Sequence, residues 1–327
     1  MKFGNKYRLL TFLLLFLTVL ASITGRYQGT GTYLDIFENS LLQRLILQVR
    51  IPRILISMIV GAGLAVSGLV MQTVFQNSLA EPGVLGINQA AGFGAALGYL
   101  LFPTMGIPIN IFAFVCGLIA LFLVLQIARM MKGTNRIALI FAGIAVSALF
   151  SAGVGILKYI ADPLDQLPSI VFWLLGGLST SSWSAVLQIA PITILSLIII
   201  YLMRWRINVY ALDDSVLYSL GVRRRAEVYL ILAISVLLTT SIISFSGLVG
   251  WVGLIIPNIA RLSFGYNIRK SLPAAILLGA IFVLVSDTFS RTLIAGEIPL
   301  GIITAFIGAM VFILLIIGKG IRIVKNE

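Results

Sequence analysis

The side chains that most often perform chemistry are scarce in this sequence of 327 residues. Histidine is absent, and the one cysteine, Cys116, lies within an apolar run with no partner for a disulfide or a thiolate metal site. A haem ligand of the usual kind, a zinc site and a histidine general base are therefore excluded. No GxxxxGKS/T phosphate loop occurs either, so we expect no ATPase site, no enzymatic activity, and no metal or cofactor bound by this chain.

Four ionisable residues stand out because they lie beside or within apolar runs. Arg50 and Arg53 flank Pro52 directly before an apolar run, and long basic side chains at such an edge commonly extend to the membrane interface. Asp287 is the one acid inside an expected span, and Arg291 follows it one helical turn later. Because an i,i+4 ion pair would neutralise both charges, a structural role for Asp287 is favoured over a proton relay.

The elements that carry these residues are expected to be membrane helices. The chain is 60% hydrophobic and only 10% charged, and apolar runs of spanning length recur from end to end. The expected spans are 8–25, 54–75, 88–102, 108–130, 136–157, 185–203, 227–246, 250–265, 272–292 and 300–318. The third is short and rich in Gly and Ala, and the eighth contains Pro257, so either could be kinked, tilted or partly spanning. We predict an all-α polytopic membrane protein of about ten transmembrane helices, with residues 1–327 forming a single transmembrane domain.

The charge distribution predicts the orientation of these spans. Ten spans with an intracellular N-terminus place most of the 23 basic residues in cytoplasmic loops, which is the usual bias. Both termini are therefore expected in the cytoplasm, and the chain in the inner (cytoplasmic) membrane of a bacterial cell. The net charge of +12 follows from this topology and does not indicate a nucleic-acid partner, because the basic residues form no single patch.

Two classes of transport function remain open at this point. One is a pore-forming subunit driven by a separate ATPase, and the other is a secondary transporter driven by an ion gradient. Ion coupling usually needs buried carboxylates at mid-depth, whereas Asp287 is expected near the outer end of its span. The ATPase-driven class is therefore favoured, with the ion-driven class as its alternative.

Several motifs, in order and spacing, resemble one known family. They are RIPRILISMIVGAGLAVSGLVMQ at Arg50–Gln72, NSLAEPGVLG at Asn77–Gly86, ALIFAGIAVSALFSAG at Ala138–Gly153, SLGV at Ser219–Val222, FSGLVGWVGLIIPNIARLSFG at Phe245–Gly265 and DTFSRTLIAGEIPLGIITAFIGA at Asp287–Ala309. With them the chain resembles the FecCD-like permease subunits of iron-siderophore and cobalamin ABC importers, over nearly its whole length.

The resemblance implies an assembly that the residues alone do not specify. The permease would form a homodimer or a heterodimer with a second permease around a central path. Two cytoplasmic ATPase subunits would bind ATP and Mg below it, and an extracytoplasmic substrate-binding protein would dock above. An iron chelate such as a ferric siderophore is the expected substrate, with haem or cobalamin as the alternatives.

The resemblance also assigns roles to particular residues, each beside a plainer interpretation. Arg50, Arg53 and Arg291 match arginines that contact acidic residues of the docked binding protein, although interface arginines would explain the first two from sequence alone. The glycines Gly153, Gly155 and Gly308 are expected to line the path or the dimer contact, although close helix packing explains most glycines in membrane helices.

Two polar connections are expected on the cytoplasmic side. In the turn after Gln76, Asn77 and Leu79 match the family's cytoplasmic gate, with Thr134 and Asn135 as a second constriction; an ordinary loop is the alternative. Ser78 replaces the proline that the family commonly has there, which predicts a less rigid turn.

The second connection, Arg204–Glu227, suggests two short helices at a bend, because acids suit a first helical turn and glycine a helix end. The resemblance makes its Asp213–Val222 segment the ATPase coupling element, with Asp213, Asp214, Leu220, Gly221 and Val222, although a solvated basic loop is the plainer interpretation.

Overall fold

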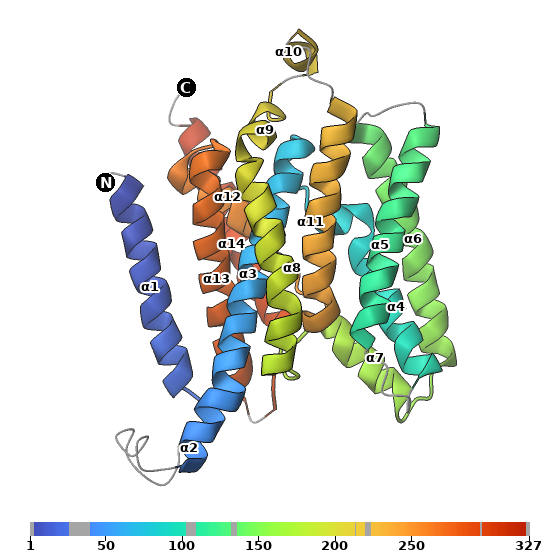
Figure 1. Cartoon of the computed structure of the whole chain (residues 1–327), viewed down its shortest axis with the longest axis vertical. Helices are drawn as coiled ribbons and strands as arrows, with labels where there is room; N and C mark the ends of the chain where they lie inside the picture. The colour runs from blue at the N-terminus through green and yellow to red at the C-terminus, as the bar shows by residue number, and fades with distance from the viewer. Residues whose placement is uncertain are drawn as a thin grey trace.

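The computed structural model describes residues 3–25, 40–102, 109–131, 136–212, 214–219, 224–294 and 296–324. Within these ranges the regular elements are helices, and the ten long ones match the ten expected spans to within a few residues (Figure 1). They are α1 (Phe3–Ile23), α3 (Ile51–Val74), α4 (Ile87–Leu101), α5 (Ile109–Met130), α6 (Arg136–Ile160), α8 (Trp183–Leu202), α11 (Arg224–Ser246), α12 (Val252–Phe264), α13 (Ile268–Thr292) and α14 (Leu300–Val324). The predicted all-α polytopic fold is confirmed.

The two spans with doubtful signals are the shortest of the ten. Helix α4 has 15 residues and α12 has 13. At about 1.5 Å per residue they extend roughly 20 Å, less than the ~30 Å hydrocarbon core. Of the three possibilities left open for these segments, kinked, tilted or partly spanning, their lengths favour the last.

Short elements connect the long helices. They are α2 (Ser40–Leu45), the π-helical turn η2 (Ile46–Arg50), the 3-10 turn η3 (Pro82–Leu85), α7 (Gln166–Leu175), α9 (Arg204–Val209) and α10 (Asp214–Ser219). Helices α9 and α10 agree with the two short helices expected between Arg204 and Glu227. Helix α7 was not predicted, because ten apolar residues are too few to span a membrane.

Helix α3 forms the centre of the fold and packs against α8, α11, α12 and α13. Two glycine pairs allow its closest contacts. A Cβ atom at Gly61 would overlap the carbonyl oxygen of Gly279 on α13, and one at Gly68 would overlap that of Gly253 on α12. Close backbone packing by small residues, expected from the sequence, is confirmed at these positions.

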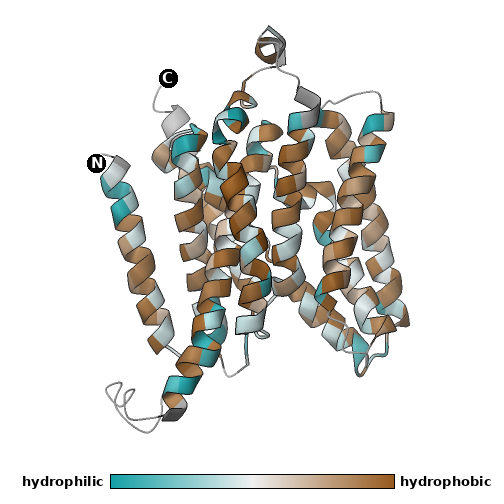
Figure 2. Ribbon diagram, viewed as in Figure 1, coloured by the Kyte–Doolittle hydropathy of each residue, from teal (hydrophilic) through white to brown (hydrophobic). Residues whose placement is uncertain are grey.

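The two ends of the helical bundle differ from its middle in polarity. Hydrophobic residues dominate the middle of the long helices, and hydrophilic residues gather towards their ends (Figure 2). The start of α1 and the end of α14 lie at the same end of the bundle as α9 and α10, and α2 and α7 lie at the opposite end (Figure 1). This placement agrees with an even number of crossings. We call the end that carries α9 and α10 the inner end and the other the outer end, following the predicted orientation.

Candidate docking and gating sites

The outer end contains a buried cluster of ionic contacts centred on Arg53 of α3. Its Nε atom donates to both oxygens of Asp287 on α13, at 3.0 and 3.1 Å, and its Nη1 and Nη2 atoms donate to Glu297, at 2.8 and 3.1 Å. Asp287 is only 1% exposed and Arg53 only 8%. One guanidinium therefore joins α3 to α13 and to the connection that leads into α14.

The predicted Asp287–Arg291 pair is confirmed, but it is the weaker of two ionic contacts that Asp287 makes. The Nε atom of Arg291 lies 3.8 Å from Asp287 Oδ2, whereas Arg53 Nη2 lies 2.9 Å from Oδ1. Sequence reasoning missed Arg53 as the partner because 234 residues separate the two positions. It also missed Glu297, which carried no signal beyond being an acid near the end of a span.

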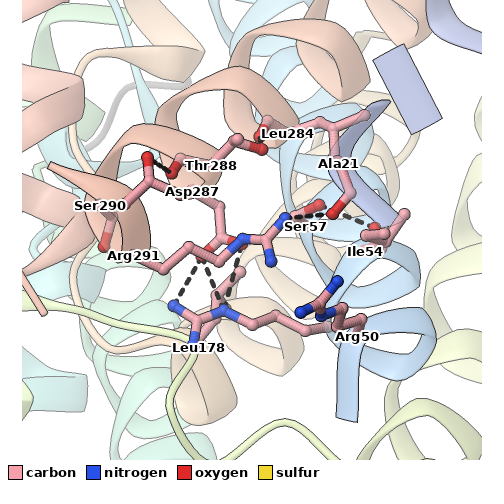
Figure 3. Close-up of polar contacts among 12 residues, drawn as sticks. Ala21, Arg50, Ile54, Ser57, Leu178, Leu284, Asp287, Thr288, Ser290 and Arg291 are labelled. Carbon is pink, nitrogen blue, oxygen red and sulfur yellow. Dashed lines mark hydrogen bonds and ion pairs between the residues drawn. The ribbon is translucent and has the colours of Figure 1, made fainter. Parts of the chain in front are cut away.

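Two arginines hold the end of α1. Arg50 Nη1 donates to the carbonyl oxygens of Ser22 and Ile23, each at 2.8 Å. Arg291 donates to those of Thr24 and Ala21, and Figure 3 shows its contact with Ala21. The last carbonyl groups of a helix lack partners within the helix. Cationic donors there satisfy these groups and oppose the negative end of the helix dipole.

The structure therefore brings the three predicted docking arginines, Arg50, Arg53 and Arg291, into one cluster. They line a cavity of about 170 Å³ together with Glu297 and the neighbouring Gly25, Leu45 and Val49. Three guanidinium groups against the carboxylates of Asp287 and Glu297 leave a formal charge of 3 − 2 = +1. Each arginine is 8% exposed and already bonded inside the chain, so contact with a docked partner stays a prediction.

The inner end contains the turn that was predicted to form a gate. Helix α3 ends at Val74, and the Asn77 side chain accepts the Leu79 N–H at 2.9 Å, so a side-chain turn closes the loop. Leu79 is 53% exposed, and Gly86 packs tightly against the backbone of Ser147 on α6. The apolar Leu79 thus projects from a loop that lies beside α6. Thr134 and Asn135 fall outside the described residues.

Ser78, which replaces the family's proline, is held from another helix. Its carbonyl oxygen accepts a hydrogen bond from Asn258 Nδ2 at 3.0 Å, and Asn258 belongs to α12. The expected loss of rigidity is therefore opposed by a tertiary contact across 180 positions. The only signal for Asn258 in the sequence was a polar residue after Pro257 in an apolar run.

Helix α12 is itself fixed to α3 by a buried arginine with uncharged acceptors. Arg261 donates to Gln72 Oε1 at 3.0 Å, Thr73 Oγ1 at 2.8 Å and the Leu69 carbonyl at 3.2 Å. Gln72 in turn donates to the carbonyl of Leu254 at 3.0 Å. These contacts place Asn258 opposite the loop of residues 77–80, which we call the gate loop.

The expected coupling segment is described only in part. Asp214 starts α10, as predicted for an acid in a first turn, whereas Asp213, Leu220, Gly221 and Val222 lie outside the described residues. Leu217 is 2% exposed and belongs to the main apolar core, although α10 projects beyond α9 and α11 (Figure 1). Below α10, Tyr210 donates to Glu227 Oε2 at 2.8 Å, which joins the end of α9 to α11.

The three glycines expected to line the path differ in their surroundings. No atom lies within 4 Å of a Cβ placed on Gly155, so this position faces open space. A Cβ at Gly153 would meet the Phe93 ring at 2.7 Å, and one at Gly308 would meet Trp251 Cβ at 2.7 Å. Within this chain the last two are packing positions, and their role in a path stays a prediction.

An all-helical polytopic bundle with a cationic cluster at one end and a polar loop at the other agrees with a membrane transport subunit, and comparison with known proteins identifies the family. The model of the FecCD transport family matches residues 9–318. The molybdate import system permease MolB of Haemophilus influenzae is 37% identical over 315 residues, covering 93% of this chain and 92% of its own. An iron chelatin transport system permease of Helicobacter pylori is 38% identical over 279 residues, covering 85% and 84%.

A solved structure shows the same fold. It is an inward-facing conformation of an ABC transporter assigned to the metal-chelate type, with a TM-score of 0.89 and 36% identity, covering 96% of this chain and 99% of that one. The chain belongs to the FecCD transport family, and it is a multi-pass permease subunit of an ABC importer.

Proposed function

We propose that this permease carries an iron chelate, such as a ferric siderophore, into the cell. The observation that carries the proposal is the uncharged character of the two helices expected to form the path. Residues 137–157 of α6 and 300–318 of α14 contain no ionisable side chain. A chelate encloses its metal within its own ligands, so it needs no charged ligand groups from these helices.

Exposed apolar side chains on α6 and α14 support a dimer around this path. They are Phe141, Ile144 and Leu149 on α6, and Ile302, Phe306 and Met310 on α14. Apolar side chains that face outwards are expected against lipid. The open position at Gly155, also on α6, allows the backbone of a helix from a second subunit to approach closely. The proposed contact is the same for a second copy or for a different permease, so it leaves the composition of the dimer open.

The proposed cycle uses both ends of the chain. A loaded binding protein presents carboxylates to Arg50, Arg53 and Arg291, because the cluster retains a positive charge and guanidinium groups bind carboxylates in a bidentate manner. ATP binding with Mg on two partner ATPases moves the segment around α10, and the loop at Asn77 and Leu79 opens to the cytoplasm. Haem and cobalamin remain the alternatives within the family.

The test is substrate uptake by the reconstituted transporter. The chain, its ATPase and its binding protein are placed in liposomes and offered a radiolabelled ferric hydroxamate chelate, haemin, cobalamin and molybdate in separate assays. We expect ATP-dependent, vanadate-sensitive uptake of the ferric chelate that a proton uncoupler does not reduce. Preferred uptake of molybdate would contradict the proposed substrate, and uncoupler-sensitive uptake without ATP would show an ion-driven transporter.

A further inference from the structure

Gln76 joins the gate loop to the segment that leads into α10. Its Nε2 atom donates to the carbonyl oxygens of Leu212, at 2.5 Å, and Tyr210, at 3.3 Å, more than 130 positions along the chain. Gln76 directly precedes Asn77, and Leu212 directly precedes the predicted coupling segment. The side-chain amide thus connects two regions that no sequence motif places together.

The backbone of Gln76 has an unusual conformation. Its φ angle is +49°, and among the described residues only Trp251 is another non-glycine with positive φ. Residues with a Cβ are disfavoured in this left-handed region, and such strain persists only where surrounding contacts maintain it. The contacts here are the backbone bond from Gln76 N–H to Thr73 O, at 3.2 Å, and the two bonds made by the side chain.

The two partners of Gln76 follow directly after α9: Tyr210 is buried, whereas Leu212 is 43% exposed. Ile207 and Tyr210 at the end of α9 are each no more than 1% exposed, and Glu227 of α11 binds both Tyr210 and Arg206. The loop that follows Gln76 is exposed from Asn77 to Leu79 and is held elsewhere by Asn258. A displacement of the Tyr210–Leu212 carbonyls therefore acts on the gate loop through Gln76.

We propose that Gln76 is a positioning residue for transport, which transmits movement of the α9–α10 region to the inner gate loop. The inference rests on the proposed gate and coupling roles but not on the substrate. Because the loop is attached to α12 through Ser78 and to the α9–α10 region through Gln76, loss of the Gln76 amide leaves the loop in place and separates it from the ATPase side.

The experiment compares Gln76→Ala with wild type in the reconstituted transporter, and measures substrate molecules moved per ATP hydrolysed. The substrate is whichever compound of the uptake panel the wild type transports, so an error in the substrate assignment does not affect the ratio. We expect the ratio to fall about fivefold, the scale of two exposed neutral hydrogen bonds. An unchanged ratio would overturn the proposal.

Two further variants separate coupling from folding and from strain. Gln76→Gly removes the same amide but accepts a positive φ without strain, so its thermal midpoint should be at least as high as that of Gln76→Ala, while its ratio falls as in Gln76→Ala. A Gly variant with a wild-type ratio would show that strain, and not the amide, is responsible, and would overturn the proposal. Gln188→Ala, which removes an exposed amide that donates to Ser184 one turn away, is the matched control and should leave the ratio unchanged.

Discussion

The outer and inner ends of this permease are held by different kinds of contact. At the outer end, Arg53 binds Asp287 and Glu297 through charged groups, two of them almost fully buried. At the inner end, the gate loop is held by the neutral amides of Gln76 and Asn258 on backbone carbonyls. The outer cluster is held by charges, and the gate loop is held by a small set of ordinary hydrogen bonds.

This difference predicts which of the two regions rearranges more easily. Leaving a buried charge without its partner is strongly unfavourable, so the outer cluster resists any rearrangement that does not supply a substitute charge. A neutral hydrogen bond contributes only about 0.5–1.5 kcal/mol net, because water replaces a lost partner at an exposed site. We therefore expect the gate loop to rearrange more readily than the outer cluster, which should change only when another charged group arrives.

The largest effect is expected from Asp287→Ala. This change removes the buried carboxylate that Arg53 and Arg291 share, so buried positive charge is left without its partner. We expect the free energy of unfolding to fall by about 3–5 kcal/mol. Thermal unfolding in detergent measures it. Asp165→Ala is the matched control, because Asp165 is exposed at the start of α7 and makes no capping hydrogen bond there. Equal stability of the two variants would contradict the structural role of the Arg53–Asp287 pair.

A smaller effect is expected from Asn258→Ala, which removes the bond to Ser78 O. The free energy of unfolding should fall by about 1 kcal/mol, and amide hydrogen exchange at Leu79 and Ala80 should become faster. Ser78→Pro should restore slow exchange in the double variant, because proline fixes φ and the Ser78 N–H makes no hydrogen bond within the described residues. A double variant as mobile as Asn258→Ala would show that rigidity at Ser78 is not what Asn258 provides.

Glu297→Gln should change stability less, by no more than about 1 kcal/mol, since the Glu297 side chain is 33% exposed. Its effect on the rate of association with the binding protein should be larger than its effect on stability. The formal charge of the cluster rises from +1 to +2, so a binding protein with acidic docking residues should associate faster at low salt. Stopped-flow association at two salt concentrations measures this, and a slower rate at low salt would contradict docking on the arginines.

The smallest effect concerns Glu81 in the inner loop, where burial raises the pKa of the carboxyl above its ordinary value of 4.5. The folded chain keeps this proton at pH values where the unfolded chain has lost it, so stability should fall as pH rises from 4.5 towards the raised pKa. Glu81→Gln should remove this part of the pH dependence of thermal unfolding, and Asp165→Asn should not. Identical pH profiles for wild type and Glu81→Gln would refute the assignment.

The sequence by itself determined the ten helices, the irregularity of the third and the eighth, and the Asp287–Arg291 pair. It could do so because helix length, apolar composition and i,i+4 spacing are local properties, which a single stretch of chain displays. The family motifs added the gate, docking and coupling assignments, which remain predictions for Arg50, Asn77 and the segment after Leu212.

Only the tertiary structure decided which distant residues meet. Arg53 lies 234 positions from Asp287, Asn258 lies 180 from Ser78, and Gln76 lies 136 from Leu212. Each contact depends on how α3 packs against α12, α13 and the end of α9, and the periodicity of any one segment does not contain that information. The glycine contacts of α3 set these helices close enough for the side chains to reach one another, and so the packing of the bundle fixed the partners that the sequence left open.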